Sequence, residues 1–240
     1  MFLKKIGLTL FILGYSFSIK AQTVDSIISN YITFIGGEQQ WKTIHTIITS
    51  GIYNYGGIEF PFTAYSKAPN LYKFVVPFNG KYYAQAFDGK QGWKIDAFKN
   101  ETKKTLLTGK PALAMANEAD VELESPFINY QKKGHQAILE GKDTVNAIMC
   151  FKVKFIRSNS ETETYFFDSN NFGLIKKIAV SKNAEMQNAM LNTFYSDYHE
   201  VNGLKIPYKS ISKTDDGQTI LTITLNKIEI NIPLPDTEFQ

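Results

Sequence analysis

The chain has 240 residues, of which 43% are hydrophobic and 14% aromatic, with a formal net charge of +3. This small excess comes from Lys4, Lys5 and Lys20; the remaining residues hold 23 basic and 23 acidic side chains. After residue 21 no run of Lys or Arg exceeds two, which excludes the clustered basic surface of a nucleic-acid-binding protein. We therefore expect no nucleic-acid partner.

The first 21 residues have the pattern of a secretory signal peptide. Lys4 and Lys5 precede an apolar stretch over 6–19, and Ala21 supplies the small residue of a cleavage site. The apolar stretch is too short to span a bilayer comfortably. We therefore predict a signal peptide over 1–21, cleavage near Ala21, and a soluble periplasmic domain over 22–240. Because no cysteine follows the cleavage site, we expect no lipid anchor.

Cys150 is the single cysteine, so no disulfide within the chain is possible. It lies in the apolar run 148–151, and a free cysteine in such surroundings behaves as a small hydrophobic residue. We predict a buried, unreactive thiol.

The mature chain opens with apolar residues at helical spacing over 24–35. Thr23 is suited to cap the first turn, and Gly36-Gly37 supplies the residues that end a helix. The pattern predicts one amphipathic helix at the start of the domain.

Period-two alternation of β-branched and aromatic residues follows, divided by turn pairs such as Asn79-Gly80. This alternation is typical of short antiparallel strands joined by hairpins. The predicted strands are 47–55, 60–65, 71–78, 82–87, 93–98 and 103–107.

Residues 110–133 interrupt the strands. The run that begins at Pro111 is rich in alanine and predicts a helix with proline in its first turn. Ser125-Pro126 predicts a second short helix through Tyr130, ended by Gly134. Helices inserted between strands must cover part of a sheet.

The alternation then resumes, with predicted strands at 137–140, 148–156, 162–167, 174–180, 186–198, 204–212 and 219–230. About a dozen strands in a flat sheet would leave large faces uncovered, so a strongly curved sheet or partial barrel is expected. No linker rich in proline or serine divides the chain, which favours one domain over 22–240.

Groups that carry catalysis or bind metals are scattered. His45, His135 and His199 fall in three separate segments without zinc-ligand spacing. The sequence has no glycine-rich phosphate loop after a strand and no serine elbow. We therefore predict no catalytic residues, metal or cofactor, and an enzyme is the weakest of the functions considered.

Several strands, such as 71–76, carry apolar residues on both faces. One face can pack on a helix, and the other needs a second layer, a partner or a ligand. An ordinary two-layer core explains most of these residues without any ligand.

Five motifs in this order resemble the LolA-like superfamily, in particular the outer-membrane lipoprotein-sorting proteins of Gram-negative bacteria. They are YITFIGGEQQWKTI (31–44), KAPNLYKF (67–74), QAFDGKQGW (85–93) and the segments 165–177 and 195–208. The resemblance implies an α+β, mainly β fold: an unclosed antiparallel β-barrel whose concave face is covered by the N-terminal and inserted helices.

The resemblance further implies a non-catalytic periplasmic carrier or binder that shelters the acyl chains of a lipoprotein or lipid between sheet and helices. We expect it to be a monomer. An inner- or outer-membrane protein would act as donor or acceptor. The carriers use an arginine near the strand–helix interface, whereas the mature chain has only Arg157, late in a strand. The implied lining residues are Ile27, Ile28, Tyr31, Phe60, Phe62, Tyr72, Phe74, Tyr83, Trp93, Leu113, Met115, Phe127 and Ile128.

A second hypothesis uses the same fold differently. The domain would be an envelope protein-interaction or sensing module, with helix side chains filling the space that a carrier keeps for its cargo. An open apolar cavity that holds lipid would favour the carrier, and a space filled by helix side chains would favour the interaction module.

Overall fold

The structure is a computed structural model that describes residues 22–122, 125–181, 186 and 188–240. The predicted signal peptide, 1–21, lies outside the described residues. Among those that are described, no helix combines the length and hydrophobicity that a membrane crossing requires.

Helix α1 (Val24–Phe34) opens the described chain as predicted. Thr23 Oγ1 accepts a hydrogen bond from the backbone N–H of Ser26 at 3.2 Å, so Thr23 is the N-cap. The helix ends where Gly36 and Gly37 take φ values of 114° and 85°. Ile27, Ile28 and Tyr31 are buried, as expected for one face of an amphipathic helix. A single turn, α2 (Glu38–Trp41), follows.

Within the described residues, one antiparallel sheet of 13 strands forms the body of the protein, in the order β6-β5-β4-β3-β2-β1-β13-β12-β11-β10-β9-β8-β7. Its strands are β1 (Thr46–Tyr55), β2 (Ile58–Lys67), β3 (Leu71–Phe78), β4 (Lys81–Asp88), β5 (Gly92–Asp96), β6 (Glu101–Leu106), β7 (Gln136–Val145), β8 (Ile148–Ile156), β9 (Thr162–Asp168), β10 (Leu174–Val180), β11 (Met190–Val201), β12 (Leu204–Lys213) and β13 (Thr219–Ile230).

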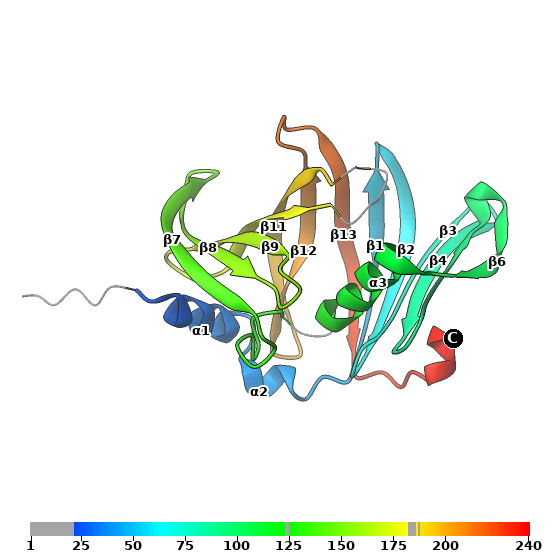
Figure 1. Cartoon of the computed structure of the whole chain (residues 1–240), viewed down its shortest axis with the longest axis horizontal. Helices are drawn as coiled ribbons and strands as arrows, with labels where there is room; N and C mark the ends of the chain where they lie inside the picture. The colour runs from blue at the N-terminus through cyan, green and yellow to red at the C-terminus, as the bar shows by residue number, and fades with distance from the viewer. Residues whose placement is uncertain (1–21, 123–124, 182–185, 187) are drawn as a thin grey trace, which may run out of the picture.

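The sheet does not close on itself. Strands β6 and β7 lie at its two edges, and Figure 1 shows them at opposite sides of a curved sheet. The prediction of a mainly β, unclosed antiparallel sheet with few helices is confirmed. Two 3₁₀ turns, η1 (Ala97–Lys99) and η3 (Asp236–Phe239), lie after β5 and at the C-terminal end of the described chain.

Strand β7 extends five residues beyond its predicted end at residue 140. It runs to the hairpin turn at Asn146 and Ala147, both with positive φ, 48° and 65°. A two-residue hairpin of this type favours glycine in second place. Because position 147 holds alanine and not glycine, no turn residue marks the end of this strand in the sequence.

The inserted helix α3 (Gly109–Glu122) forms as predicted. The second predicted helix, Ser125 through Tyr130, is wrong: this segment is a series of turns. Asn129 takes a φ of 54°, in the left-handed region, where a helix cannot continue. Backbone bonds such as Ile128 N–H to Ser125 C=O, 3.0 Å, close single turns in its place.

Candidate functional site

Helices α1 and α3 pack on the same face of the sheet. Directly paired residues of an antiparallel sheet share a face, and so do residues two apart in one strand. A continuous row of such pairs runs across the sheet from Val153, which packs under α1, to strands whose residues pack under α3. One row of paired residues is Val153, Tyr165, Lys177, Thr193, Ser212, Leu221, Tyr55 and Ile58; a neighbouring row is Tyr195, Ser210, Ile223, Tyr53 and Phe60. We call this surface the helix face.

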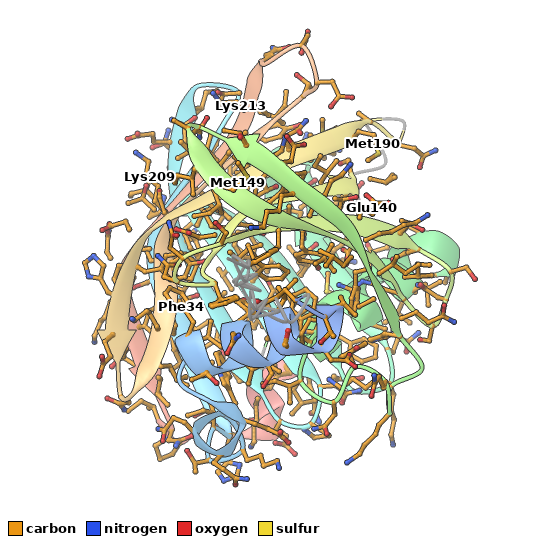
Figure 2. The ribbon with its side chains drawn as sticks, turned by 90° about the vertical axis from the view of Figure 1, so that its left-hand side faces the viewer. Phe34, Glu140, Met149, Met190, Lys209 and Lys213 are labelled. Atoms are coloured by element: carbon orange, nitrogen blue, oxygen red, sulfur yellow. The ribbon has the colours of Figure 1, made fainter. Side chains whose placement is uncertain are left out.

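At one end of the helix face, α1 packs into a cluster that we call the α1 core. Phe127 is 1% exposed and its ring centroid lies 5.5 Å from that of Tyr31 and 4.7 Å from that of Tyr165. Figure 2 looks onto this helix, with Phe34 labelled, and shows side chains between α1 and the strands behind it. Four predicted lining residues belong to the α1 core: Ile27, Ile28, Tyr31 and Phe127. Ile128 is buried as well, with 1% exposure.

At the other end, α3 packs on β3, β4 and β5 over a second cluster, the α3 core, to which residues of β2 also belong. Met115 and Ala119 of the helix contact this cluster. Five predicted residues of the sheet belong to it or pack against it: Phe62 and Tyr72 are buried, whereas Phe60, Phe74 and Tyr83 are half-buried. Leu113 of α3 is 57% exposed, so it does not join them.

Trp93 lies apart from the other predicted residues. It pairs with Ala86 and belongs to a cluster with Ala84 and Ala86 on the opposite face of the sheet. Its indole Nε1–H donates to the backbone carbonyl of Phe239 at 2.8 Å. Trp93 therefore holds the C-terminal turn η3 against the sheet.

Between the two cores, the helix face carries side chains that are only half-buried. Tyr53 on β1 and Ile223 and Leu225 on β13 pack beside Phe60 and against the α3 core. Sequence reasoning missed these three residues. The alternation of side chains in these strands is present in the sequence, but it does not show which of the two faces α3 contacts. Only the pairing of β1 with β2 and β13 identifies that face.

A buried polar cluster adjoins the α1 core on the same face. Arg157 Nε and Nη2 lie 3.0 and 2.9 Å from Glu163 Oε2, and the Tyr165 hydroxyl donates to the same oxygen at 2.8 Å. Burial alone would raise the pKa of Glu163. The charges of Lys177 and then Arg157, with hydrogen bonds from Tyr165 and Arg157, outweigh burial and lower that pKa. Glu163 is thus held as a carboxylate.

In the described part of the chain, no three His, Cys, Asp or Glu side chains are grouped so as to hold a metal ion. Cys150 is fully buried, and burial followed by the charge of Asp168 raises its pKa to about 11. The predicted buried thiol is confirmed. Nε2 of His199 lies 2.8 Å from Oδ1 of Asp197, on an exposed stretch of β11.

Two surface pockets lie away from the predicted lining residues. One, of about 530 Å³, is lined by His45, Thr46, Lys67 and residues 231–235. The other, of about 570 Å³, lies at the β3–β4 hairpin, beside Pro61, Pro77 and Tyr82. Neither includes any of the 13 residues predicted to line a lipid site.

No protein-family model and no curated protein sequence matches the chain. Solved structures do match it. A DUF1329 family protein from Desulfovibrio piger is 13% identical, with a TM-score of 0.61, over 92% of this chain and 98% of that one. A LolA superfamily protein from Nitrosomonas europaea is 13% identical, with a TM-score of 0.58, over the same shares of the two chains.

A third structure, assigned as an outer membrane lipoprotein-sorting protein domain from Vibrio parahaemolyticus, is 9% identical with a TM-score of 0.57. The match covers 90% of this chain and 95% of that one. At such identities the likeness concerns the fold. The expected LolA-like fold is confirmed over nearly the whole chain.

Proposed function

We propose that this chain of LolA-like fold is a non-catalytic periplasmic carrier that shelters the acyl chain of a lipid or lipoprotein. The observation that carries the proposal is the half-buried apolar surface that packs against the α3 core: Tyr53, Phe60, Phe74, Ile223 and Leu225. These side chains lie beside α3 on one continuous face. In this proposal α1 and α3 act as covers over the concave side of the sheet, and an acyl chain completes the layer between them.

The length of an acyl chain sets the hydrophobic free energy that a carrier must supply. An acyl chain with about 15 methylenes costs roughly 12 kcal/mol to expose to water, at about 0.8 kcal/mol for each methylene. At about 25 cal/mol per Å², this corresponds to roughly 480 Å² of apolar area. Several half-buried aromatic and aliphatic side chains can supply an area of that order.

The predicted lining residues would have different roles in holding an acyl chain. Phe60 and Phe74 would contact the cargo directly, because they remain half-buried. Phe62, Tyr72 and Met115 would form the floor beneath it. The residues of the α1 core would act as a rigid wall, since their side chains already fill that end of the helix face.

Binding of a fluorescent fatty acid to the mature domain tests the proposal. We expect Ile223→Ser to weaken binding about tenfold, the effect of losing roughly 1.4 kcal/mol of contact. The matched control is Ile52→Ser on the adjacent strand, because Ile52 is also half-buried but pairs with Thr224 on the opposite face. The control should bind the probe like the wild type.

Mass spectrometry of an organic extract from gently purified protein supplies a second readout. We expect a bound lipid or acylated peptide. An extract without lipid, together with no binding of the fluorescent fatty acid, would contradict the proposal and favour the protein-interaction module.

We also propose that residues 1–21 are removed on export and that residues 22–240 form one domain, which moves between a membrane donor and an acceptor. The lysines before an apolar stretch and the single continuous sheet support this. N-terminal sequencing of protein from the periplasmic fraction should begin near Gln22. Recovery of full-length chain from the cytoplasm would contradict it.

A further inference from the structure

Two prolines end the pairing of β2 with β3 part of the way along both strands. The ladder between these strands stops at the pair Thr63 and Val75, although both strands continue for several residues toward their hairpin turns. The same register, extended by two residues, would place Pro61 opposite Pro77. A proline has no backbone N–H, so neither residue can donate to the other strand. The break in the ladder therefore follows from the sequence.

The backbone nitrogens of the two prolines face each other's strand. In a two-residue hairpin the residues that flank the turn form a hydrogen-bonded pair, and every second residue from there points to the same partner. The β1–β2 turn ends at Ile58, so by this count Pro61 points away from β1 and toward β3. The β3–β4 turn begins after Phe78, so Pro77 points toward β2. The prolines thus interrupt this one ladder and leave both hairpins fully paired.

The two hairpins separate toward their turns, and we call the place between them the split. Figure 1 shows β2 and β3 close together at the end where they pair and diverging toward the other end. The pocket of about 570 Å³ lies at the split: Pro61 lines it from one side, and Pro77 and Tyr82 line it from the other. Because Pro61 pairs with Ile52, this pocket lies on the face opposite the helix face.

On the helix face, the split adjoins the apolar surface of the proposed site. Phe60 of that surface lies on the β2 side of the split. Phe98, in η1 directly after β5, belongs to the other side, and its ring centroid lies 6.3 Å from that of Phe60 with an interplanar angle of 66°. Phe98 is 40% exposed. An aromatic pair therefore spans the split on the side of the apolar surface.

We infer that the split is the entry for the acyl chain, which passes sideways between β2 and β3 when the rings of Phe60 and Phe98 part. The inference rests on the proposed function and specifies how the same site is filled. A slot between strands admits a linear chain, while the headgroup or the polypeptide of an acylated protein stays in solvent at the outer pocket. The prolines keep the slot available, because unbroken strands would close it with main-chain hydrogen bonds.

Two variants alter the split without changing the apolar surface itself. Pro61→Val together with Pro77→Val restores both missing N–H donors and places the new side chains on the opposite face, so the ladder should extend and close the split. Phe98→Ala removes one ring of the pair that spans the split and should open it. The control is Pro207→Val, because Pro207 also lies within a strand, on β12, three strands away from β2.

The experiment follows the binding of cis-parinaric acid, a fluorescent linear fatty acid, to the mature domain by stopped flow, and measures its Kd by titration. A barrier to passage is crossed in both directions, so a change in its height alters the association and dissociation rate constants by the same factor and leaves Kd unchanged. We expect both rate constants to fall about tenfold in P61V/P77V, which corresponds to roughly 1.4 kcal/mol of barrier height. Both should rise in Phe98→Ala, and Pro207→Val should match the wild type.

The outcomes separate the entry from the carrier function. If the wild type binds the probe and the rate constants are the same in P61V/P77V and Phe98→Ala, the chain enters elsewhere and the proposed function stands. A change in the dissociation rate constant alone, with a matching change in Kd, would show that the split holds the ligand, which also overturns the inference. If the valine variant folds poorly, Phe98→Ala decides by itself. If the wild type does not bind the probe, the proposed function and the entry fail together.

Discussion

Arg157 and Glu163 form a buried ion pair across the turn between β8 and β9, with the two guanidinium contacts made to a single carboxylate oxygen. Arg157 is 9% exposed and Glu163 5% exposed. The pair therefore lies in the interior, next to Tyr165 of the α1 core. Its removal affects both stability and the charge of the helix face.

Replacing Arg157 by Met should destabilise the fold by about 3–5 kcal/mol, because the Glu163 carboxylate would stay buried without the guanidinium that contacts it. Urea denaturation of the two proteins measures the difference. The double variant R157M/E163Q should recover a large part of the loss, since it leaves no unpaired buried charge. A double variant no more stable than R157M would contradict this account.

The same pair predicts how stability depends on pH. Because the pKa of Glu163 is lower in the folded chain than its ordinary value of about 4.3, ionised Glu163 stabilises the fold above that value. This contribution is lost as pH falls through the lowered, folded-state pKa. Glu163→Gln should therefore flatten the acid limb of stability against pH below about pH 4. An acid limb of unchanged steepness in that variant would assign the loss to other carboxylates.

Phe127 is the centre of the α1 core, where its ring contacts those of Tyr31, Phe155, Tyr165 and Phe167. Phe127→Ala should cost about 3–5 kcal/mol, because a large cavity remains in a packed interior. The control is Phe98→Ala: Phe98 is 40% exposed, so its loss should cost less than about 1 kcal/mol. Thermal melting of both variants measures the contrast.

Gly51 sits on β1 at the shift of register with β13. A Cβ atom at this position would lie 2.0 Å from the backbone carbonyl oxygen of Thr224. Gly51→Ala should therefore destabilise the sheet by at least the roughly 1–3 kcal/mol typical of overpacking. Gly57→Ala serves as control, because its added Cβ meets no atom within 4 Å and only its positive φ is strained. Equal losses in the two variants would contradict the backbone clash.

Cys150 should be unreactive in the native protein. Its thiol is fully buried, and a pKa of about 11 leaves on the order of one thiolate per thousand at pH 8. Ellman's reagent should modify it slowly in the native chain and rapidly after unfolding in guanidinium chloride. Fast labelling of the native protein would show that β8 opens readily.

The sequence predicted the elements well where local chemistry is decisive. The ends of β3, β8, β10 and β13 are those that alternation and turn residues indicated. Two predictions failed because the residue type at one position did not indicate its backbone conformation. Ala147 occupies a turn position that usually holds glycine, and Asn129 adopts a left-handed conformation inside a segment of good helical composition.

The candidate site was only partly predictable. Apolar residues such as Phe60 and Phe74 were identified by type and position, and the structure brings them together. Trp93 has the same chemistry but lies on the opposite face, beneath the C-terminal turn. Ile223 and Leu225 were not predicted, because nothing in the local sequence distinguishes the two faces of their strand.

The sequence by itself therefore determined the class of fold, the order of its elements and the buried state of Cys150, because these follow from periodicity, turn chemistry and hydrophobicity along the chain. Only the tertiary structure decided which side of each strand faces α1 and α3. That choice depends on the register of strands far apart in sequence, such as β1 with β13. It is this register that brings Phe60, Tyr53 and the apolar side chains of β13 onto one surface.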